Sequence, residues 1–307
     1  MKKALPAGPI IQCAANISEG RNQTLLNDLV RAASSVPEAV LADHSSDPDH
    51  NRTVFTLLGS PGPLERAIME LASVAIARID LRQHRGVHPR IGALDVVPFS
   101  PIRAVTMDEC VELAHRIGSR IAEKLNIPIY FYEEAAAPGR LRHLPDIRRG
   151  QFEGLFTEPL DGIRKPDAGP SSPHLTAGAT VIGARPPLVA YNVNLDTPDV
   201  EMARHVSSSL RRDRQNTDNL TGVRTLGLYL PTKNMAQVSM NITRLDKSSL
   251  PVVFDYVRRQ ALDLGVETAS SDVIGLTPLS ALDGSTPDEI KWVSYHSRHI
   301  LEYWLEH

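Results

Sequence analysis

Hydrophobic and polar positions along residues 9–99 predict four strands and two helices. Apolar or β-branched runs bounded by turn residues predict strands at 9–15, 39–43, 53–58 and 94–99. A helix is expected over about 22–34, and apolar residues at helical spacing between Leu64 and Ile79 predict a second one. The resulting βαββαβ order is that of a ferredoxin-like half.

The same order of elements returns in the C-terminal part of the chain. Strands are expected at 188–195, 223–230, 235–243 and 267–275. Thr197 and Pro198 predict the start of a helix that runs to about 211. Apolar residues between Val253 and Leu264 predict another helix, which ends at Gly265. The repetition is one of element order, not of residue identity, and it predicts a second ferredoxin-like half.

Three further segments lie outside this repeated pattern. A capping box formed by Thr106 and Glu109 begins a helix expected over 107–125, and a second box at 286–289 predicts a C-terminal helix. Residues 135–178 are rich in Pro and Gly and have little periodicity, as in a functional loop or a linker. We therefore expect two domains, at 1–178 and 179–307.

Each predicted half covers one face of its sheet with helices and leaves the other face to be buried. Packing the two sheets face to face would bury both, which makes an α+β fold. The strand at 188–195 has one face that changes from Leu188 and Ala190 to Asn192 and Asn194. Two interpretations of these asparagines are equally good. They line a polar groove between the two sheets, or their side chains form hydrogen bonds in the turn that follows the strand.

Composition narrows the class of protein. The formal net charge of −3 over 307 residues argues against binding to nucleic acid or to an anionic membrane. Two cysteines, Cys13 and Cys110, make neither a disulfide framework nor a metal-ligand spacing, which fits a reducing compartment. The charged N-terminus lacks the apolar core of a signal peptide, and no apolar run reaches membrane-spanning length. A cytoplasmic location is expected.

The densest group of chemically versatile side chains lies at 84–95. His88 is the candidate for proton transfer near neutral pH, and Pro89 restrains the backbone around it. Arg85 and Arg90 flank it, and guanidinium groups bind carboxylates in bidentate fashion. The segment predicts an acid–base site for an anionic substrate, with a solvated surface loop as the alternative.

Two other segments are candidates for the site. Residues 43–52 hold three aspartates and two histidines, but their spacing matches no metal-ligand motif and suits a turn, so no metal is expected. Asp43 is a candidate for orienting His88 or a substrate nitrogen. Residues 169–178 combine glycine, proline and hydroxyl side chains, which suits contact with a flat ligand or a plain linker, and they match no dinucleotide or phosphate-loop motif.

Five blocks in one collinear order resemble the glutamate formiminotransferase family. They are Ala-Asn-Ile-Ser-Glu-Gly-Arg-Asn at 15–22, Asn-Arg-Thr-Val-Phe at 51–55, His-Pro-Arg-Ile-Gly-Ala-Leu-Asp at 88–95, Gly-Pro-Ser at 169–171 and Asn-Met-Ala-Gln-Val-Ser at 234–239. The resemblance implies two ferredoxin-like halves with sheets packed face to face around a folate-binding tunnel. It also implies transfer of a formimino group from N-formiminoglutamate to tetrahydrofolate, a co-substrate, in histidine degradation.

The resemblance assigns the catalytic histidine to His88 and folate contact to ten consecutive residues. These are Gly169, Pro170, Ser171, Ser172, Pro173, His174, Leu175, Thr176, Ala177 and Gly178. Arg90 and Arg185 are candidates for the substrate carboxylates, and Asn192 for the substrate or folate. The family further implies a homodimer.

Two positions depart from the vertebrate members of the family. Those carry an aspartate where this chain has Ser45, so that role is expected either to pass to Asp43 or to be absent. They also carry a tryptophan where this chain has Ala177. The cyclodeaminase module of the vertebrate forms has no counterpart in these residues, so a separate cyclodeaminase is an expected partner. Formyl transfer between 5-formyltetrahydrofolate and glutamate, or folate binding without catalysis, are the alternative functions.

Overall fold

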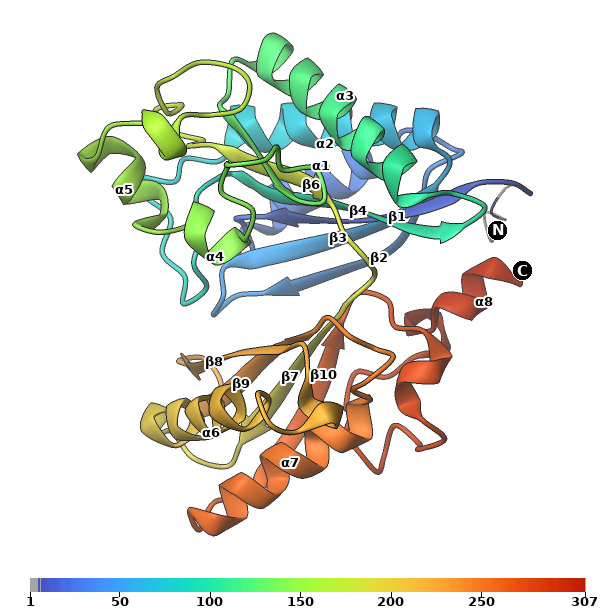
Figure 1. The fold of residues 1–307 in the computed structure, drawn as a ribbon, viewed down its shortest axis with the longest axis vertical. Coiled ribbons are helices and arrows are strands. Elements are labelled where there is room, and N and C mark those ends of the chain that lie inside the picture. Colours follow the sequence, from blue (N-terminus) through green and yellow to red (C-terminus); the bar gives the residue numbers. More distant parts are fainter. Residues whose placement is uncertain (1–4, 6, 307) are drawn as a thin grey trace. The chain divides into compact units, whose positions relative to one another are not determined.

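The computed structural model describes residue 5 and residues 7–306, so the charged start at 1–4 lies outside the described residues. The chain divides into two compact units between Pro187 and Leu188, here called the N-unit and the C-unit (Figure 1). No helix within the described ranges combines the length and hydrophobicity that crossing a bilayer requires.

The N-unit contains a six-stranded sheet in the order β2-β3-β1-β4-β6-β5. Its strands are β1 (Ile10–Ile17), β2 (Val40–Asp47), β3 (Arg52–Gly59), β4 (Leu94–Arg103), β5 (Ile129–Glu133) and β6 (Thr180–Ala184). Its helices are α1 (Gln23–Ala33), α2 (Pro61–Arg78), α3 (Met107–Leu125), α4 (Leu144–Ile147) and α5 (Gln151–Thr157), with a 3₁₀ turn η1 (Gly162–Arg164). The first four strands pair antiparallel in the predicted ferredoxin-like order, and β6 and β5 extend the sheet in parallel.

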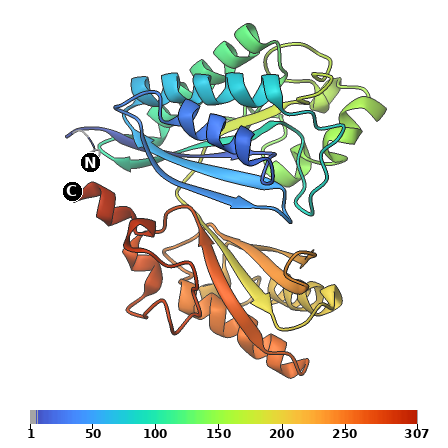
Figure 2. The ribbon, with the colours of Figure 1, turned by 180° about the vertical axis from the view of Figure 1, so that it is seen from behind.

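Local sequence signals mark the start of α1 and of α3. The side chain of Asn22 accepts a hydrogen bond from the backbone N–H of Leu25 at 3.1 Å at the start of α1, and Thr106 and Glu109 form the capping box of α3. The apolar stripes of α1, α2 and α3 pack on one face of the sheet, against side chains such as Cys13 and Phe55 (Figure 2). This core positions β1 and β3, which carry part of the site.

The opposite face of this sheet is covered by α4 and α5 only on the side of β4, β6 and β5. There Ile147 and Leu155 join Val96, Tyr130 and Tyr132 in a smaller apolar cluster. The segment 135–178 is therefore not a structureless loop, because it holds two short helices and a 3₁₀ turn.

Two N-unit features differ from the sequence expectations. The strand β5 was not predicted, because its first four residues are buried on both faces and show no alternation. The expected domain boundary between 178 and 179 is also wrong. The strand β6 pairs with β4 and β5, so it belongs to the first sheet, and the division follows Pro187.

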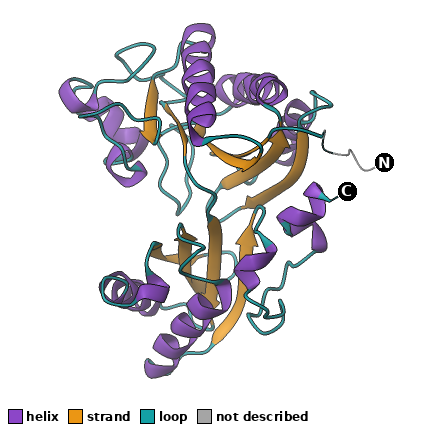
Figure 3. Ribbon diagram, turned by 45° about the vertical axis from the view of Figure 1, so that its right-hand side comes forward, coloured by secondary structure: helices purple, strands orange, loops and turns teal. Residues whose placement is uncertain are grey.

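The C-unit is a four-stranded antiparallel sheet in the order β10-β7-β9-β8, again the ferredoxin-like order. Its strands are β7 (Val189–Leu195), β8 (Val223–Leu230), β9 (Met235–Ile242) and β10 (Thr268–Ile274). Its helices are α6 (Val200–Asp213), α7 (Leu250–Asp263) and α8 (Leu301–Leu305), with 3₁₀ turns η2 (Asp218–Leu220), η3 (Leu279–Leu282) and η4 (Ser297–His299). The helices α6 and α7 pack on one face of the sheet through an apolar cluster that includes Tyr191 and Val193 (Figure 3).

The helix predicted from the capping box at 286–289 is wrong. The backbone N–H of Thr286 does bond to the carboxylate of Glu289 at 2.8 Å, but Lys291 has a φ of +52°. A left-handed residue this close to the box stops helical propagation, so the bond closes only a turn. The last helix is α8 instead.

Candidate active site

His88 lies on the loop that joins α2 to β4, and backbone hydrogen bonds fix this loop at several points. The N–H of Leu81 bonds to the carbonyl of Thr176 at 2.8 Å, and the N–H of Ala93 bonds to that of Ala177 at 3.0 Å. Between them, the N–H of Val87 bonds to the carbonyl of Asp49 at 3.0 Å. The loop therefore joins the turn before β3 to the segment 169–178.

Glycines allow these loops to approach one another closely. A Cβ on Gly86 would lie 2.2 Å from the carbonyl oxygen of His50, and one on Gly178 would lie 2.1 Å from that of Ile91. Gly178 also has a φ of +69°, which disfavours other residues. Three of the five family-like blocks, at 15–22, 51–55 and 88–95, meet around His88 through hydrogen bonds.

His84 serves to hold the loop in place. Its Nε2 lies 2.8 Å from the carbonyl oxygen of Asn51, and its Nδ1 accepts a hydrogen bond from Nε of Arg90 at 3.3 Å. The side chain is buried, and this burial is the main cause of its lowered pKa. Both ring nitrogens of His84 thus hold the loop to β3 and to Arg90.

The hydrogen bonds of His88 define its tautomer. Its Nδ1 lies 2.8 Å from the carbonyl oxygen of Pro89, which can only accept, so Nδ1 carries the proton. Its Nε2 therefore presents a lone pair, and Nη1 of Arg52 donates to it at 2.6 Å. The half-buried ring stacks on that of His50, with 5.7 Å between centroids.

The surroundings of His88 oppose its protonation. Burial is the largest cause of a pKa well below the ordinary value, followed by the positive charges of Arg52 and Arg148 and by His50. The bond to Pro89 acts in the opposite direction. At neutral pH His88 is therefore an uncharged imidazole, the form that can accept a proton.

Arg52 is the side chain of the site that the sequence analysis missed. It is the first residue of β3, and its Nη2 donates to the side-chain oxygen of Asn16 on β1. Its Nε is buried and has no hydrogen-bond partner. Burial and the charge of Arg148 lower its pKa to about 10, so it stays charged at neutral pH. The signal was present in the family-like block at 51–55, where the arginine itself received no role.

A second guanidinium lies close to the first. Nη2 of Arg148, at the end of α4, donates to Oδ2 of Asp95. Oδ1 of Asp95 accepts the backbone N–H groups of Ile91 at 2.8 Å and Gly92 at 3.2 Å. The Nε of Arg148 is buried without a hydrogen-bond partner, like that of Arg52. The cluster thus brings two arginines together with one fully buried carboxylate.

The structure places Asp43 on β2, in the same sheet as Arg52. Oγ of Ser45 donates to Oδ2 of Asp43 at 2.7 Å, and both side chains lie on one face of the strand. The described hydrogen bonds of His88 go to Arg52 and Pro89. Orientation of His88 by Asp43 therefore stays a prediction.

The two arginines expected to bind substrate carboxylates have different surroundings. Arg90 is buried and bonds in bidentate fashion to Glu153, at 2.8 and 2.7 Å, which lowers the pKa of Glu153 to about 2. The guanidinium of Arg90 is thus paired with a carboxylate of the protein itself, and its binding to a substrate carboxylate stays a prediction. Arg185 follows β6, and its Nη1 donates to the carbonyl of Pro186 at 3.0 Å.

Residues 169–178 form an ordered loop. His174 and Gly178 exchange two backbone hydrogen bonds of 2.9 Å, and Nδ1 of His174 accepts the N–H of Ala177 at 3.1 Å. Leu175 has 63% of its surface exposed, whereas Ala177 is fully buried. The linker alternative is wrong for this segment, because its backbone also holds both ends of the His88 loop. Its contact with folate stays a prediction.

The asparagines of β7 lie on the face of the C-unit sheet opposite α6 and α7. The side-chain nitrogen of Asn194 donates to Oγ of Ser270 on β10 at 2.9 Å, and its oxygen accepts from Gln237 on β9 at 2.9 Å. Bonding in the following turn is therefore wrong for Asn194. Asn192 lies in register between Asp272 and Ser239 on a row of polar residues.

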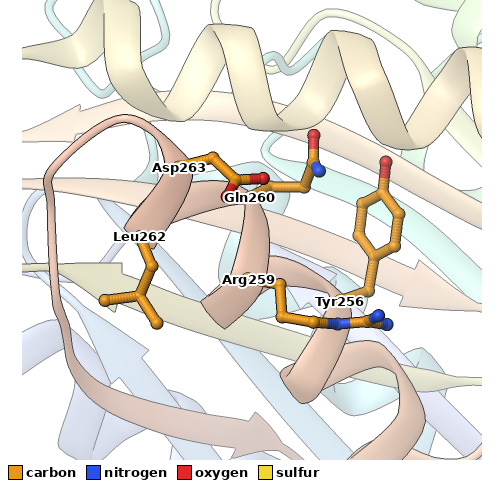
Figure 4. A pocket seen from close by; sticks show the side chains of 5 residues that line it. All are labelled: Tyr256, Arg259, Gln260, Leu262 and Asp263. Carbon is orange, nitrogen blue, oxygen red and sulfur yellow. The ribbon is translucent and has the colours of Figure 1, made fainter.

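The described residues offer no metal-binding cluster. No group of three or more His, Cys, Asp or Glu side chains in those ranges is placed to hold a metal ion. Two open pockets lie on the C-unit, one beside η3 and one of about 300 Å³ on α7. Figure 4 shows the second, lined by Tyr256, Arg259, Gln260, Leu262 and Asp263, none of which belongs to the His88 cluster.

Comparison with known proteins adds independent information. Residues 10–185 match the N-terminal subdomain of the formiminotransferase domain, and residues 190–287 match the formiminotransferase domain. The chain is 41% identical to glutamate formimidoyltransferase of Streptococcus pyogenes serotype M1, over 89% of this chain and 90% of the relative. It is 36% identical to glutamate formimidoyltransferase of Thermoplasma acidophilum, over 97% of each chain.

Longer relatives match over part of their length. The formimidoyltransferase-cyclodeaminase of Rattus norvegicus is 41% identical over 89% of this chain. The match covers 51% of that relative, so the chain spans about half the length of the formimidoyltransferase-cyclodeaminases.

Proposed function

This chain belongs to the formiminotransferase family, and from that premise we propose that it is a glutamate formimidoyltransferase. It transfers the formimino group of N-formimino-L-glutamate to N5 of tetrahydrofolate, a reaction of histidine degradation and one-carbon metabolism. The observation that carries the proposal is the uncharged His88, with its proton on Nδ1 and a lone pair on Nε2. An imidazole in this form can receive the proton that the reaction must move.

The chemistry requires one proton to change nitrogen atoms. N5 of tetrahydrofolate attacks the amidine carbon, which forms the new C–N5 bond and a tetrahedral intermediate. Nε2 of His88 accepts the proton from N5 and returns it to the glutamate nitrogen, and the bond from the carbon to that nitrogen then breaks. No net proton is gained or lost by His88. Positioned acid–base catalysis of this kind contributes typically about 10²–10⁴-fold in rate.

The remaining predicted residues take supporting roles in this proposal. Asp43 supplies a carboxylate next to Ser45, the position where vertebrate members carry an aspartate, and its acceptor oxygen is fixed by the 2.7 Å bond from Ser45. Arg185 binds a substrate carboxylate. Asn192 contributes a neutral amide from the C-unit.

Tetrahydrofolate is the co-substrate, and residues 169–178 are the segment proposed to contact it. The two reciprocal backbone hydrogen bonds between His174 and Gly178 fix this loop. Leu175 supplies an exposed apolar side chain for a flat ring. Ala177 is fully buried, so it does not offer the surface that a tryptophan would give at this position. A homodimer, a cytoplasmic location and a separate cyclodeaminase complete the proposal.

A direct assay tests this function. Purified protein is mixed with N-formimino-L-glutamate and tetrahydrofolate, the reaction is acidified, and 5,10-methenyltetrahydrofolate is followed by absorbance. A parallel assay supplies 5-formyltetrahydrofolate and glutamate and measures N-formylglutamate. We expect strong signal in the first assay and little in the second.

The other outcomes point to the alternative functions. Turnover only with the 5-formyl donor would replace the proposal with formyl transfer through the same histidine. Binding of tetrahydrofolate without turnover of either donor would replace it with a folate-binding module.

A further inference from the structure

The proposed base, Nε2 of His88, already accepts a hydrogen bond from within the protein. Nη1 of Arg52 donates to the Nε2 lone pair of His88 at 2.6 Å, within normal hydrogen-bond distance. A lone pair that accepts from a charged guanidinium cannot also accept a proton from N5 of the folate. Arg52 must therefore leave Nε2 before His88 can act.

The cluster also has two hydrogen-bond donors that no group in it accepts. Nε of Arg52 and Nε of Arg148 are both buried without a hydrogen-bond partner. A buried guanidinium N–H without an acceptor is costly, and in native proteins such a group commonly marks the place of a missing ligand or ion. Each of these two arginines therefore keeps one buried N–H without an acceptor, and an anion is the kind of group that accepts from it.

The titratable and charged groups that act on His88 or on Arg52 come from four elements. Arg52 belongs to β3, Asp47 and His50 to the end of β2 and the turn after it, Asp95 to β4, and Arg148 to the end of α4. Asp95 is engaged by Arg148 and by two backbone N–H groups. Asp47 accepts the backbone N–H groups of Asp49 and His50, each at 2.8 Å. An additional anion is thus the chemical complement of this cluster.

We propose that Arg52 is the receptor for the α-carboxylate of the glutamate donor and that binding of this carboxylate draws Arg52 away from Nε2 of His88. Arg148 stands beside it as the second cation. The inference rests on the proposed function, because it takes the formiminoglutamate donor as the ligand. It makes the base available only when the donor is present.

Covalent chemistry selects the α-carboxylate over the γ-carboxylate. The nitrogen that His88 must protonate is bonded to Cα of glutamate, and Cα also bears the α-carboxylate. A cation that touches His88 is therefore within reach of that group, whereas the γ-carboxylate is two methylene groups further away. The other arginines fit less well, because Arg90 is filled by Glu153 and Arg185 lies beyond the end of β6.

Nitrogen-15 NMR of histidine-labelled full-length protein tests the proposal without turnover. The signals of His88 are identified by their loss in His88→Asn. Three unreactive donor analogues are titrated: N-formyl-L-glutamate, N-formyl-L-glutamine, which lacks the γ charge, and N-formyl-L-isoglutamine, which lacks the α charge. We expect the first two to move the Nε2 signal of His88 and to raise its pKa, and the third to leave both unchanged.

Variants of Arg52 give the second measurement. In Arg52→Gln without ligand, the pKa of His88 should rise, because a neighbouring positive charge is removed. N-formyl-L-glutamate should bind this variant about 10- to 100-fold more weakly, as for the loss of a charged hydrogen bond. Arg52→Lys should restore part of the affinity. Arg116→Gln, which removes an arginine of α3 paired with Glu65, is the matched control and should change neither quantity.

Specific results would overturn the inference. One is an equal response of His88 to the isoglutamine and glutamine analogues, which would assign the γ-carboxylate or no carboxylate. Another is an unchanged His88 signal in a folded Arg52→Gln protein. If that variant does not fold, the three titrations of the wild-type protein decide the question alone. A protein that fails the turnover assay but shows these shifts would refute the proposed reaction and keep the anion receptor.

Discussion

The strands β2-β3-β1-β4 of the N-unit and the sheet of the C-unit share one strand order. Each sheet packs one face against helices, α1 to α3 in the N-unit and α6 and α7 in the C-unit. The opposite faces of the two sheets carry different chemistry. In the N-unit this face holds charged and titratable groups, among them Arg52 and the neighbouring His88 and Arg148. In the C-unit the corresponding face holds mainly amides and hydroxyls, with Asn194 joined to Gln237 and Ser270. Its charged residues, Asp272 on β10 and Arg224 on β8, lie on the two edge strands. The helix-covered faces of both sheets are mainly apolar.

This contrast shows which part of each sequence determines the fold and which determines the chemistry. Alternating apolar residues of strands and the stripes of helices are enough to produce the ferredoxin-like order twice. The second face of each sheet is then free to differ. A charged cluster can move protons, whereas neutral amides can only orient a ligand by hydrogen bonds. We therefore expect substitutions in the N-unit cluster to affect turnover and those in the C-unit row to affect stability or binding.

The largest effect is expected for His88→Asn. Asparagine is polar and of similar size but cannot exchange a proton near neutral pH, so kcat for formimino transfer should fall by about 10²–10⁴-fold. The affinity for tetrahydrofolate should change little. The formimino transfer assay gives kcat, and fluorescence titration gives the affinity.

His115→Asn is the matched control for this substitution. His115 lies on α3, its ring centroid 4.2 Å from that of Phe131, outside the His88 cluster. Its kcat should stay close to that of the wild-type protein. Near-normal turnover by His88→Asn would remove His88 from the mechanism.

Asn194→Leu tests the structural side of the comparison. Leucine removes the acceptor for the amide of Gln237 and the donor to the hydroxyl of Ser270. Loss of buried hydrogen-bond partners typically costs about 1–3 kcal/mol, so the free energy of unfolding should fall by roughly that amount. Urea denaturation measures it. The same change at exposed Asn241, on the neighbouring strand β9, should alter stability by no more than about 0.5 kcal/mol.

Asn192→Ala separates binding from stability in the same row. If the amide of Asn192 orients a ligand, its removal should weaken tetrahydrofolate binding by about three- to tenfold. This is the loss of affinity expected when one hydrogen bond between uncharged groups is removed. Turnover at saturation should change little, in contrast to His88→Asn. Isothermal titration of wild type, Asn192→Ala and Asn241→Ala measures the difference. Equal affinities in all three would exclude Asn192 from the binding site.

The elements of both units could be predicted because their signals are local. The capping box of Thr106 and Glu109, the cap at Asn22 and the apolar stripes depend on neighbours within one or two turns of helix. The short strand β5 could not, since burial on both faces removes the alternation on which strand prediction depends. Face-to-face packing of the two sheets around a tunnel stays a prediction.

The site was predicted less completely because its contacts join residues far apart in the sequence. His88 was identifiable from its residue type and its family-like block. Its closest partner, Arg52, is 36 positions away, and only the pairing of β3 with β1 brings the arginine to the loop. Arg90, which is nearer in sequence, is turned toward Glu153 instead. Sequence proximity therefore did not identify the arginine that is hydrogen-bonded to His88, because that contact joins segments far apart in the chain.

The smallest expected effect concerns the stability of the protein in mild acid. The pKa of His88 in the folded protein lies well below 6.5, its value in an unfolded chain. Between these two values the unfolded chain binds more protons than the folded one, so the free energy of unfolding rises with pH in this window. The contribution of His88 is complete above about pH 6.5 and is lost progressively as the pH falls below it.

The pH dependence of stability should be weaker in His88→Asn, because the asparagine side chain does not bind a proton in this pH range. The denaturation midpoint of the wild-type protein should fall more between pH 7.5 and pH 5 than that of the variant. The pKa of His84 is also lowered, so part of the acid sensitivity should persist in His88→Asn. His115→Asn should follow the wild type. An identical pH dependence of wild type and His88→Asn would mean that the ring is as easily protonated in the folded protein as in the unfolded chain, and the electrostatic contrast between the two sheet faces would then lose its main support.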